Sequence, residues 1–502
     1  MENEKNQLEQ DRQTKLDKIR ALGIDPYGGN LQTEEDWWDS QGMTWACQET
    51  ICTLEGGKYD SKIAPKSELT AEHGPVAAGY GRIVLRREMG NLHFLTIRDD
   101  IGDIQIAISK KLVCEKEWAL AKLLDLGDLI SFEGRCAPTK VGEPTVWVRR
   151  LSISAKSLAP PPAKHEGLVD VERRYRKRYT DLWSNPEVMK MAKVRAEIVA
   201  SIRTLLWGFD FLEVETPILQ TIAGGAVAQP FKTHHKALDI PMYMRIAPEL
   251  FLKRLLVGGM PRIFEIGRNF RNEGISPRHN PEFTALELYQ SYADHENMME
   301  IVEEIVYSCV NHSADDSSIK DGITFKHKRG WRRATMTEMV QDWCGNYAKN
   351  NAGSHLEPST HTPEALYAFF SEHVEKTIIE PTFVTHLPAS VVPLAKNDGK
   401  GFALAFELIC NGQEIGCGYT EQNDPAVQEK AFEDQIGAGL DEHTKGNVEV
   451  PIGTIDDNFL DALRVGMPPA GGLGIGIDRL VMMLTGAESV RDVILFPTMR
   501  PL

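Results

Sequence analysis

The segment RNFRNEGISPRHNPEF (residues 268–283) decides the local fold, because the stretches on both sides of it have the pattern of strands. It carries three arginines, one histidine and two glutamates. Gly274, Pro277 and Pro281 prevent one helix or one central strand from running through the whole segment. The segment is therefore predicted to be a cation-rich loop between two strands, and its function depends on what negative charge it faces.

The strand after this loop, PEFTALELYQSY (281–292), is predicted to present polar side chains on one face. Side chains alternate along a strand, so Phe283, Ala285, Glu287 and Tyr289 should lie together. A ring, a carboxylate and a phenol on one face are unusual for a core. The alternative is an exposed sheet face, and this strand alone does not decide between the two.

A second stretch, FALAFELICNGQEIGCGYTEQND (402–424), is predicted to form a hairpin at the Asn-Gly dipeptide 411–412. A regular two-residue hairpin places Glu407 opposite Gly416. It also makes Glu407 and Glu414 diagonal neighbours on one face, about 7–8 Å apart at the backbone.

Two carboxylates at this separation repel each other unless a cation or a shared proton lies between them. Hard oxygen donors favour magnesium held jointly with substrate phosphates. Glu421 would point to the other face of a regular strand. A β-bulge at Gly416 or Gly418 would turn it back to the face of the carboxylate pair.

The segment GGLGIGIDRLVMMLTG (471–486) is predicted to be a strand followed by a helix that begins near Asp478. It contains no GxGxxG frame, so a Rossmann dinucleotide site is excluded. Its alternate glycines leave one strand face without side chains, which a flat ligand could approach; they are Gly472, Gly474 and Gly476. Arg479 lies at the helix start, where anions are favoured. These features together predict a nucleoside triphosphate site without a P-loop.

The remainder of the chain suggests three further parts before the region that contains these motifs. Residues 76–154 contain five short alternating runs with a helical stretch after the third, which is typical of an OB-type barrel. Such barrels commonly bind single-stranded nucleic acid, although a purely structural β-module is the alternative. The predicted organisation is an N-terminal helix and irregular extension over 1–75, an OB-fold domain over 76–156, a proline-rich linker over 157–170 and an α+β domain over 171–502.

The bulk composition sets limits on the cellular setting. The chain has 502 residues, a formal charge of −16 and eight scattered cysteines without CxxC spacing, which favours reduced thiols in the cytosol. The negative charge argues against indiscriminate binding to nucleic acid or acidic membranes, although RRYRKR (173–178) could form a local basic surface. No apolar run is long enough for a membrane span, and the N-terminus lacks the apolar region of a secretory signal.

Three motifs in order make the chain resemble the class II aminoacyl-tRNA synthetases, and within them the lysyl-tRNA synthetase family. The class motifs are matched by GFDFLEVETPIL (208–219), FRNEGISPRHNPEF (270–283) and GLGIGIDRL (472–480). The subclass is matched by AGGAVAQPF (223–231), MRIAPELFLKRLLVGG (244–259) and DVILFPTMRP (492–501). The HIGH and KMSKS signatures of class I are absent.

This resemblance implies an α+β fold, with an antiparallel sheet of six or seven strands flanked by helices and preceded by an OB-fold anticodon-binding domain. It implies a cytoplasmic homodimer that uses ATP, Mg²⁺, L-lysine and tRNA(Lys). The lysine carboxylate attacks the α-phosphorus of ATP to give lysyl-adenylate, and the tRNA 3′-hydroxyl then takes the lysyl group. Such an enzyme needs no nucleophilic side chain and works by positioning and charge neutralisation.

The resemblance also implies roles for individual residues. Arg271 and Arg479 would be the catalytic arginines, and Glu407 and Glu414 the magnesium carboxylates. The expected ATP-binding residues are Arg271, Glu273, Arg278, His279, Asn280, Phe283 and Arg479, with the adenine between the Phe283 ring and the Arg479 guanidinium. The expected lysine-binding residues are Glu249, Arg271, Glu287, Tyr289, Cys417 and Glu421, of which Glu421 and Tyr289 would take the ε-ammonium.

Two positions depart from the family pattern. Cys417 stands where the family usually has an asparagine near the substrate carboxylate, which brings lysine affinity and sensitivity to oxidation into question. Arg150 stands where a glutamate that helps to read the anticodon is expected. The predicted anticodon-binding residues are Arg86, Arg87, Phe94, Gln105 and Arg150.

Two alternative functions stay open from the sequence. One is a relative that lysylates a protein or makes dinucleoside polyphosphates, although stand-alone relatives of that kind usually lack the OB domain. The other is a non-catalytic tRNA-binding paralogue, which should have lost at least one of four residues that this chain retains: Arg271, Glu407, Glu414 and Arg479.

Overall fold

The computed structural model describes residues 2–28, 74–99, 102–162, 168, 170–226, 228–312, 330–350, 356, 358, 362–444 and 455–501. The chain divides into two compact units, residues 1–186 and 187–502, and each is described by itself. Most of the irregular extension predicted within residues 1–75 lies outside the described residues. The predicted boundary in the proline-rich segment 157–170 stays a prediction.

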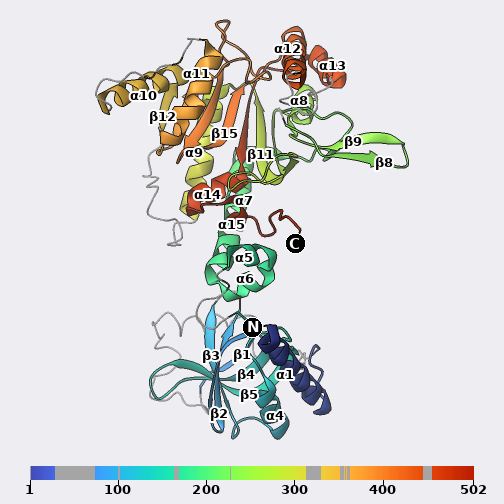
Figure 1. The fold of residues 1–502 in the computed structure, drawn as a ribbon, viewed down its shortest axis with the longest axis vertical. Coiled ribbons are helices and arrows are strands. Elements are labelled where there is room, and N and C mark those ends of the chain that lie inside the picture. Colours follow the sequence, from blue (N-terminus) through green and yellow to red (C-terminus); the bar gives the residue numbers. More distant parts are fainter. Residues whose placement is uncertain are drawn as a thin grey trace. The chain divides into compact units, whose positions relative to one another are not determined.

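The first unit contains a closed five-stranded barrel with the strand order β1-β2-β3-β5-β4 (Figure 1). The strands are β1 (Val76–Met89), β2 (Leu92–Arg98), β3 (Asp103–Ser109), β4 (Leu129–Pro138) and β5 (Pro144–Ala155). Burial alternates along β2, as a period of two requires. The five strands and the helix after the third, α4 (Glu115–Leu123), confirm the predicted OB-type barrel.

The helices of the first unit pack on or follow the barrel. The apolar face of α1 (Glu2–Ala21) buries Leu16 and Ile19, and the Arg12 guanidinium donates to the carbonyls of Leu126 and Ser157. A capping box formed by Cys114 and Glu117 begins α4. The helices that follow the barrel in sequence are α5 (Val171–Arg176) and α6 (Arg178–Ser184).

The second unit is built on an eight-stranded sheet with the order β12-β13-β14-β15-β16-β11-β10-β6. The expected six or seven strands were therefore too few. The central pairs are antiparallel, whereas the outer pairs β12–β13 and β10–β6 are parallel. The strands are β6 (Leu212–Glu213), β10 (Arg262–Phe270), β11 (Glu282–Ser291), β12 (Arg332–Thr335), β13 (Thr382–Thr385), β14 (Ala405–Cys410), β15 (Gln413–Thr420) and β16 (Ala470–Gly476).

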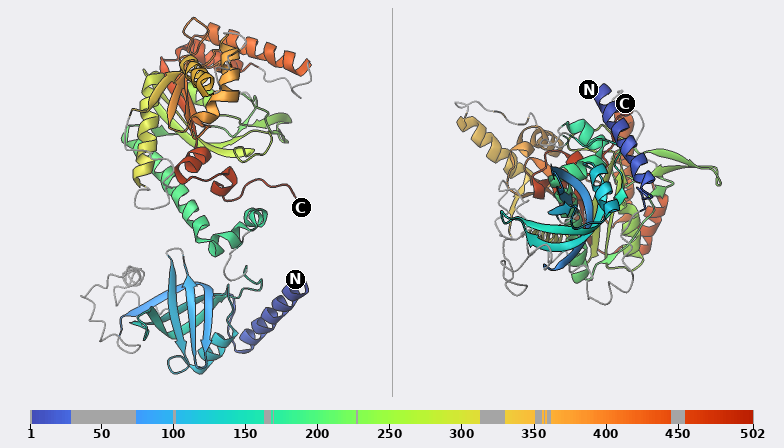
Figure 2. Two further views of the ribbon diagram at one scale, coloured as in Figure 1. Left: turned by 60° about the vertical axis from the view of Figure 1, so that its left-hand side comes forward. Right: turned by 90° about the horizontal axis from the view of Figure 1, so that it is seen from below.

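One face of this sheet is covered by three helices that form the main core. They are α7 (Pro186–Gly208), α9 (His295–His312) and α14 (Ile477–Thr485) (Figure 2). Apolar residues recur along α7 at the spacing of one helix face, with Val194, Ile198, Ile202 and Leu206 buried against the sheet. The opposite face of the sheet is left for the cavity described below.

The remaining elements surround this opposite face or extend the sheet edges. A small three-stranded sheet joins β7 (Leu219–Gln220), β9 (Ile240–Met244) and β8 (Lys232–His235). The other helices are α8 (Glu249–Val257), α10 (Met336–Asn350), α11 (Pro363–Phe369), α12 (Pro425–Thr444), α13 (Asp457–Gly466) and α15 (Val490–Val493). A π-turn over Phe370–Val374 and a 3₁₀ turn over Glu375–Thr377 continue α11. Within the described residues, no helix is long and apolar enough to cross a membrane.

Candidate active site and nucleic-acid-binding face

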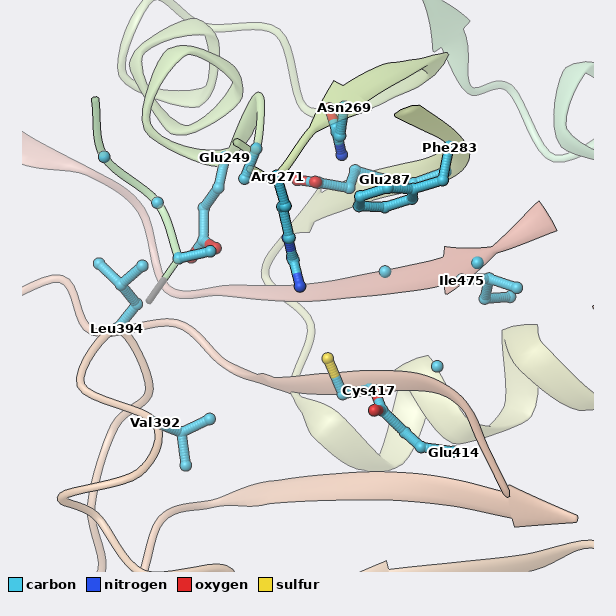
Figure 3. Close-up of a pocket in the computed structure, with 18 of the residues that line it drawn as sticks. Glu249, Asn269, Arg271, Phe283, Glu287, Val392, Leu394, Glu414, Cys417 and Ile475 are labelled. Atoms are coloured by element: carbon cyan, nitrogen blue, oxygen red, sulfur yellow. The ribbon is translucent and has the colours of Figure 1, made fainter. Parts of the chain in front are cut away.

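A cavity of about 570 Å³ opens on the free face of the eight-stranded sheet. Its walls come from segments far apart in the sequence: the 268–283 loop, strands β11, β15 and β16, the start of α8, and α12. This size and mixed lining are typical of a small-molecule site. Three of the four residues predicted to define the site line this one cavity, namely Arg271, Glu414 and Arg479. Figure 3 shows Arg271 reaching into its centre.

Strand β11 presents its functional face to the cavity, as the alternation predicts. Phe283, Ala285, Glu287 and Tyr289 all line the cavity. The alternative of a plain exposed face is wrong, because Glu287 and Tyr289 are only 9% and 3% exposed.

The three alternate glycines of β16 form the glycine floor of the cavity: Gly472, Gly474 and Gly476. Gly474 lies opposite Glu287 and Gly472 opposite Tyr289. A Cβ at Gly472 would lie 2.0 Å from Glu421 Oε1, so glycine is required there by close packing. At Gly474 the nearest atom would be 3.8 Å away, which leaves open space for a ligand.

The hairpin of β14 and β15 turns at Asn411-Gly412 as predicted, but its register differs from the predicted one. Ile409 pairs with Glu414, whereas Leu408 pairs with Gly416 and Glu407 with Cys417. Ile415 is thus an extra residue in β15. The predicted pairing of Glu407 with Gly416 is wrong for this reason.

This bulge also explains why Glu421 lies on the same face of the sheet as Glu414. It lies at Ile415, one residue before the first of the two positions that were considered. Beyond it, Cys417 and Tyr419 share the cavity side with Glu414. Glu421 continues the same alternation and is buried against Gly472, on the same side of the sheet as Tyr289.

The cation-rich loop is held by contacts within itself and with the Asn411-Gly412 turn. His279 Nδ1 lies 2.8 Å from Ser276 Oγ, and Arg278 Nη1 donates to the Gly412 carbonyl over 3.1 Å. Burial and the nearby Arg479 lower the pKa of His279, so its ring is neutral at physiological pH. The Asn280 amide donates to the Glu282 carbonyl and accepts from the Thr498 N–H. Asn280 therefore anchors the loop, and like Arg278 and His279 it also lines the cavity.

The two predicted catalytic arginines enter the cavity from different walls. The Arg271 guanidinium lies 5.1 Å from the centre of the Phe283 ring. Arg479 donates to the Glu414 carbonyl over 2.9 Å and to its carboxylate over 3.2 Å, and it lies 3.2 Å from His279 Nε2. In this structure the Arg271 guanidinium therefore lies over the Phe283 ring, which is expected to stack on the adenine.

The carboxylates Glu407 and Glu414 have the character of a cation site. Burial and the charges of Glu414 and Glu375 raise the pKa of Glu407 to about 8, while the Tyr367 hydroxyl donates to it over 3.2 Å. Among the described residues, no group of three or more His, Cys, Asp or Glu could hold a metal by itself. The pair therefore fits a magnesium ion only if substrate phosphates supply further ligands.

The opposite end of the cavity is strongly acidic. Glu249 and Glu421 are 5% and 1% exposed, and burial together with Glu249 raises the pKa of Glu287 to about 8. The Tyr289 hydroxyl donates to Glu287 over 3.1 Å, and the Tyr419 hydroxyl donates to Glu249 over 2.7 Å. This end suits a ligand that carries positive charge.

The Cys417 side chain lies between the two ends, on the wall facing Arg271 (Figure 3). Burial, reinforced by Glu414 and Glu407, raises the pKa of this thiol well above its ordinary value. A thiol that stays protonated is a poor nucleophile. The structure thus argues against the oxidation sensitivity considered from the sequence.

Sequence reasoning missed three residues of the site. Lys253 is fully buried between Glu249 and Glu421, with Nζ 2.7 Å from Glu249 Oε1. The other two are Tyr419 and Tyr367, which line the cavity. The spacing of Glu249 and Lys253, four residues apart on α8, was a usable signal for an ion pair.

On the barrel, the β-ladder brings most of the predicted anticodon residues to one outer face. Arg87 pairs with Phe94, and its guanidinium donates to Gln105 over 2.9 Å. Trp147, which was not predicted, lies beside Phe94 with ring centres 6.4 Å apart. Aromatic rings beside cationic and amide groups are typical of a surface that binds single-stranded nucleic acid.

Arg86 and Arg150 are placed differently from that group. The Arg86 guanidinium is directed at the last carbonyls of α4, including those of Leu124 and Ala121, and it pairs with Glu88 over 2.6 Å. This contact caps a helix and leaves Arg86 on the opposite face of β1 from Arg87. Arg150 is exposed and lies 3.4 Å from Glu133 on β4.

Comparisons with known proteins agree with this arrangement. Residues 170–500 match the family described as "tRNA synthetases class II (D, K and N)", and residues 80–157 match "OB-fold nucleic acid binding domain". A lysine–tRNA ligase of Carboxydothermus hydrogenoformans is 43% identical, with 99% of each chain covered. A lysine–tRNA ligase of Pelotomaculum thermopropionicum is 40% identical, with 100% of this chain and 96% of that protein covered. A lysine–tRNA ligase of a Thermoanaerobacter species is 41% identical, with 99% of this chain and 97% of that protein covered. The chain therefore belongs to the class II tRNA synthetases, within the lysine–tRNA ligase family.

Proposed function

We propose that the protein attaches L-lysine to tRNA(Lys) in an ATP-dependent reaction through lysyl-adenylate. One observation carries this proposal: a single cavity has an acidic end, with Glu249 and Glu287, and an arginine-rich end, with Arg271, Arg278 and Arg479. An amino acid with a cationic side chain fits the first end, and a triphosphate fits the second.

In this scheme Arg271 has the central position, because it reaches the point where the two ends meet. Its guanidinium pairs with the lysine carboxylate and the α-phosphate, which are the two reacting groups. Holding them together lowers their repulsion and orients the carboxylate oxygen toward phosphorus. Arg278, His279 and Arg479 bind the distal phosphates of the leaving pyrophosphate.

The adenine stacks on Phe283, and Glu273 accepts from its amino group. Because Arg271 covers Phe283 in this structure, its guanidinium must swing off the ring when the base binds. Glu407 and Glu414 would hold Mg²⁺, which supplies charge neutralisation at the phosphates. Arg479 then releases the Glu414 carboxylate and contacts the nucleotide instead.

Lysine lies at the acidic end, with its ε-ammonium at Glu421 and Tyr289 and its α-ammonium between Glu249 and Glu287. Cys417 lies beside the substrate carboxylate. A neutral side chain would leave Glu421 buried without a counter-charge, and this penalty is the basis of selectivity.

The barrel face with Arg87, Phe94 and Gln105 is proposed to bind the anticodon of tRNA(Lys), with bases stacked on Phe94. The exposed Arg150, which lies apart from this group beside Glu133, is proposed as a further contact to the tRNA. We assign Arg86 to the stability of the barrel instead, because its guanidinium caps α4.

A homodimer is part of the proposal. Large apolar side chains are exposed where the first class motif begins and ends, and they would be covered by a second copy: Trp207, Leu212, Ile218 and Leu219. The cytoplasm is the proposed location, since it supplies ATP and tRNA. The six cysteines that the structure describes form no disulfide with one another, which suits a reducing compartment.

The test is lysine-dependent exchange of pyrophosphate into ATP, followed by charging of purified tRNA(Lys). We expect both activities, and we expect Arg271→Ala to abolish exchange. Arg268→Ala is the matched control, because Arg268 pairs with Glu282 outside the cavity and should keep full activity. Exchange with a different amino acid would refute the specificity. Exchange without tRNA charging would favour lysylation of a protein or synthesis of dinucleoside polyphosphates, and no exchange at all would favour a non-catalytic paralogue.

A further inference from the structure

The acidic end of the cavity already contains an ammonium group from the protein itself. Lys253 on α8 is completely buried, with Nζ 2.7 Å from Glu249 Oε1 and in direct contact with Glu421 Oε2. It also lies 3.4 Å from the Leu394 carbonyl and over the Tyr419 ring at 5.6 Å. A buried lysine with two carboxylate partners is part of the chemistry of the site.

The two oxygens of Glu421 are in different situations. Oε2 contacts Lys253, whereas Oε1 is buried and has no hydrogen-bond partner among the described residues. This free oxygen lies beside Tyr289, where a side chain at Gly472 would otherwise be. A buried carboxylate oxygen without a partner is costly, so it is a strong attachment point for an incoming ammonium.

The balance of positive and negative charges at the acidic end also indicates that Lys253 takes part in binding the amino acid. The acidic end has three carboxylates, Glu249, Glu287 and Glu421, and one ammonium, Lys253. An amino acid with two ammonium groups brings the positive charges to three, equal to the carboxylates, while Arg271 balances the substrate carboxylate. Without Lys253, the same substrate would leave one carboxylate uncompensated in a buried site.

We propose that Lys253 is a positioning residue for amino-acid selection, which favours the ionised form of Glu421 and orients it so that its free oxygen receives the side-chain ammonium of the substrate. This inference rests on the proposed function and adds a specificity determinant to it. Lys253 acts through Glu249 and Glu421, and it does not touch the reacting atoms.

A positioning role for Lys253 predicts a change in the pKa of Glu421 when Lys253 is lost, which a purely structural role does not predict. Burial raises the pKa of Glu421 to about 8, and Lys253 opposes this increase. Burial works to lower the pKa of Lys253, but Glu249 and Glu421 outweigh it and keep the ammonium charged. Loss of Lys253 should therefore raise the pKa of Glu421 further. The titratable groups facing this carboxylate are Lys253 and Glu249 on α8, Glu287 and Tyr289 on β11, and Tyr419 on β15.

The experiment measures lysine-dependent ATP–pyrophosphate exchange between pH 6.5 and 9.5 for the wild type and Lys253→Met. At pH 7.5 we expect the KM for lysine to rise about 100-fold, while the KM for ATP changes less than threefold. The acid limb of kcat/KM for lysine should move up by about one pH unit or more, so activity recovers at alkaline pH. Selectivity for lysine over norleucine, which lacks the ε-amino group, should fall. Lys430→Met, an exposed lysine on α12, is the matched control and should behave as the wild type.

Each outcome is decisive. An unchanged lysine KM would overturn the proposal, and so would equal increases in both KM values without a shift of the acid limb, because that pattern indicates only a structural role. Lys253→Arg retains the positive charge and should keep the acid limb at its wild-type pH. A shifted acid limb in this variant would refute the proposal. This variant therefore tests the proposal even if Lys253→Met does not fold. Absence of lysine-dependent exchange in the wild type would instead refute the proposed function itself.

Discussion

The glycine floor provides a sharp test of where lysine binds. In Gly472→Ala the new Cβ would lie 2.0 Å from Glu421 Oε1 and 2.5 and 2.7 Å from two carbons of the Tyr289 ring. Both side chains are buried, and Lys253 holds Glu421 in place, so neither can turn away freely. Overpacking of this kind costs about 1–3 kcal/mol. If the strain displaces Glu421, the same energy corresponds to an increase of about 5- to 150-fold in the KM for lysine.

The assay is pyrophosphate exchange at saturating ATP, together with thermal unfolding. Gly472→Ala should lower the melting temperature by a few degrees and raise the KM for lysine, while the KM for ATP stays within threefold. Gly208→Ala is the stability control, since nothing lies within 4 Å of its added Cβ. Gly474→Ala should leave the fold unstrained, because its closest contact is 3.8 Å. An unchanged melting temperature together with an unchanged lysine KM in Gly472→Ala would refute this placement of the lysine side chain.

Other parts of the site give further predictions. Glu407→Gln should raise the Mg²⁺ concentration for half-maximal exchange more than tenfold, and an unchanged Mg²⁺ titration would contradict its role as a ligand. The pKa values of Glu287 and Glu421 are raised to about 8, so lysine affinity, measured by calorimetry, should increase from pH 6 to 8. For the same reason the unliganded protein should lose stability in thermal melts as the pH rises from about 4.5 through 8. A slope of the opposite sign in either measurement would refute the corresponding prediction. Phe94→Ala should raise the KM for tRNA about tenfold without affecting exchange, and an equal tRNA KM would exclude stacking. Arg86→Ala should instead lower barrel stability by about 1–3 kcal/mol, measured by chemical unfolding, and an unchanged unfolding midpoint would contradict the capping role.

Local periodicity was sufficient to predict much of the cavity. The alternation of β11 placed Glu287 and Tyr289 on one face, and the spacing of the glycines in β16 predicted a surface without side chains. Both strands lie in the middle of the sheet with continuous antiparallel pairing from Ala285 to Ser291, so a period of two holds along them. Helices α8 and α9 follow from sequence for a similar reason, because their apolar positions recur at helical spacing.

Sequence periodicity could not predict structural features that depend on a strand irregularity or on a residue far away in the sequence. The bulge at Ile415 has no marker in the sequence, because a β-branched residue there fits a regular strand equally well. The orientation of Arg86 depends on carbonyl groups at the end of α4, thirty-five or more positions away. Trp147 reaches the face of Phe94 only because β3 and β5 pair in parallel to close the barrel.

The bulge explains how one strand serves both ends of the cavity. Before it, Glu414 faces the phosphate end, where it pairs with Arg479 and raises the pKa of Glu407. After it, the alternation restarts one position later, so Cys417 and Tyr419 line the cavity and Glu421 lies against Gly472 beside Tyr289. A strand without the extra residue would direct either Glu414 or Glu421 to the other face of the sheet. In the proposed mechanism, this single inserted residue allows the reacting carboxyl group of lysine and the α-phosphate to meet over the same strand.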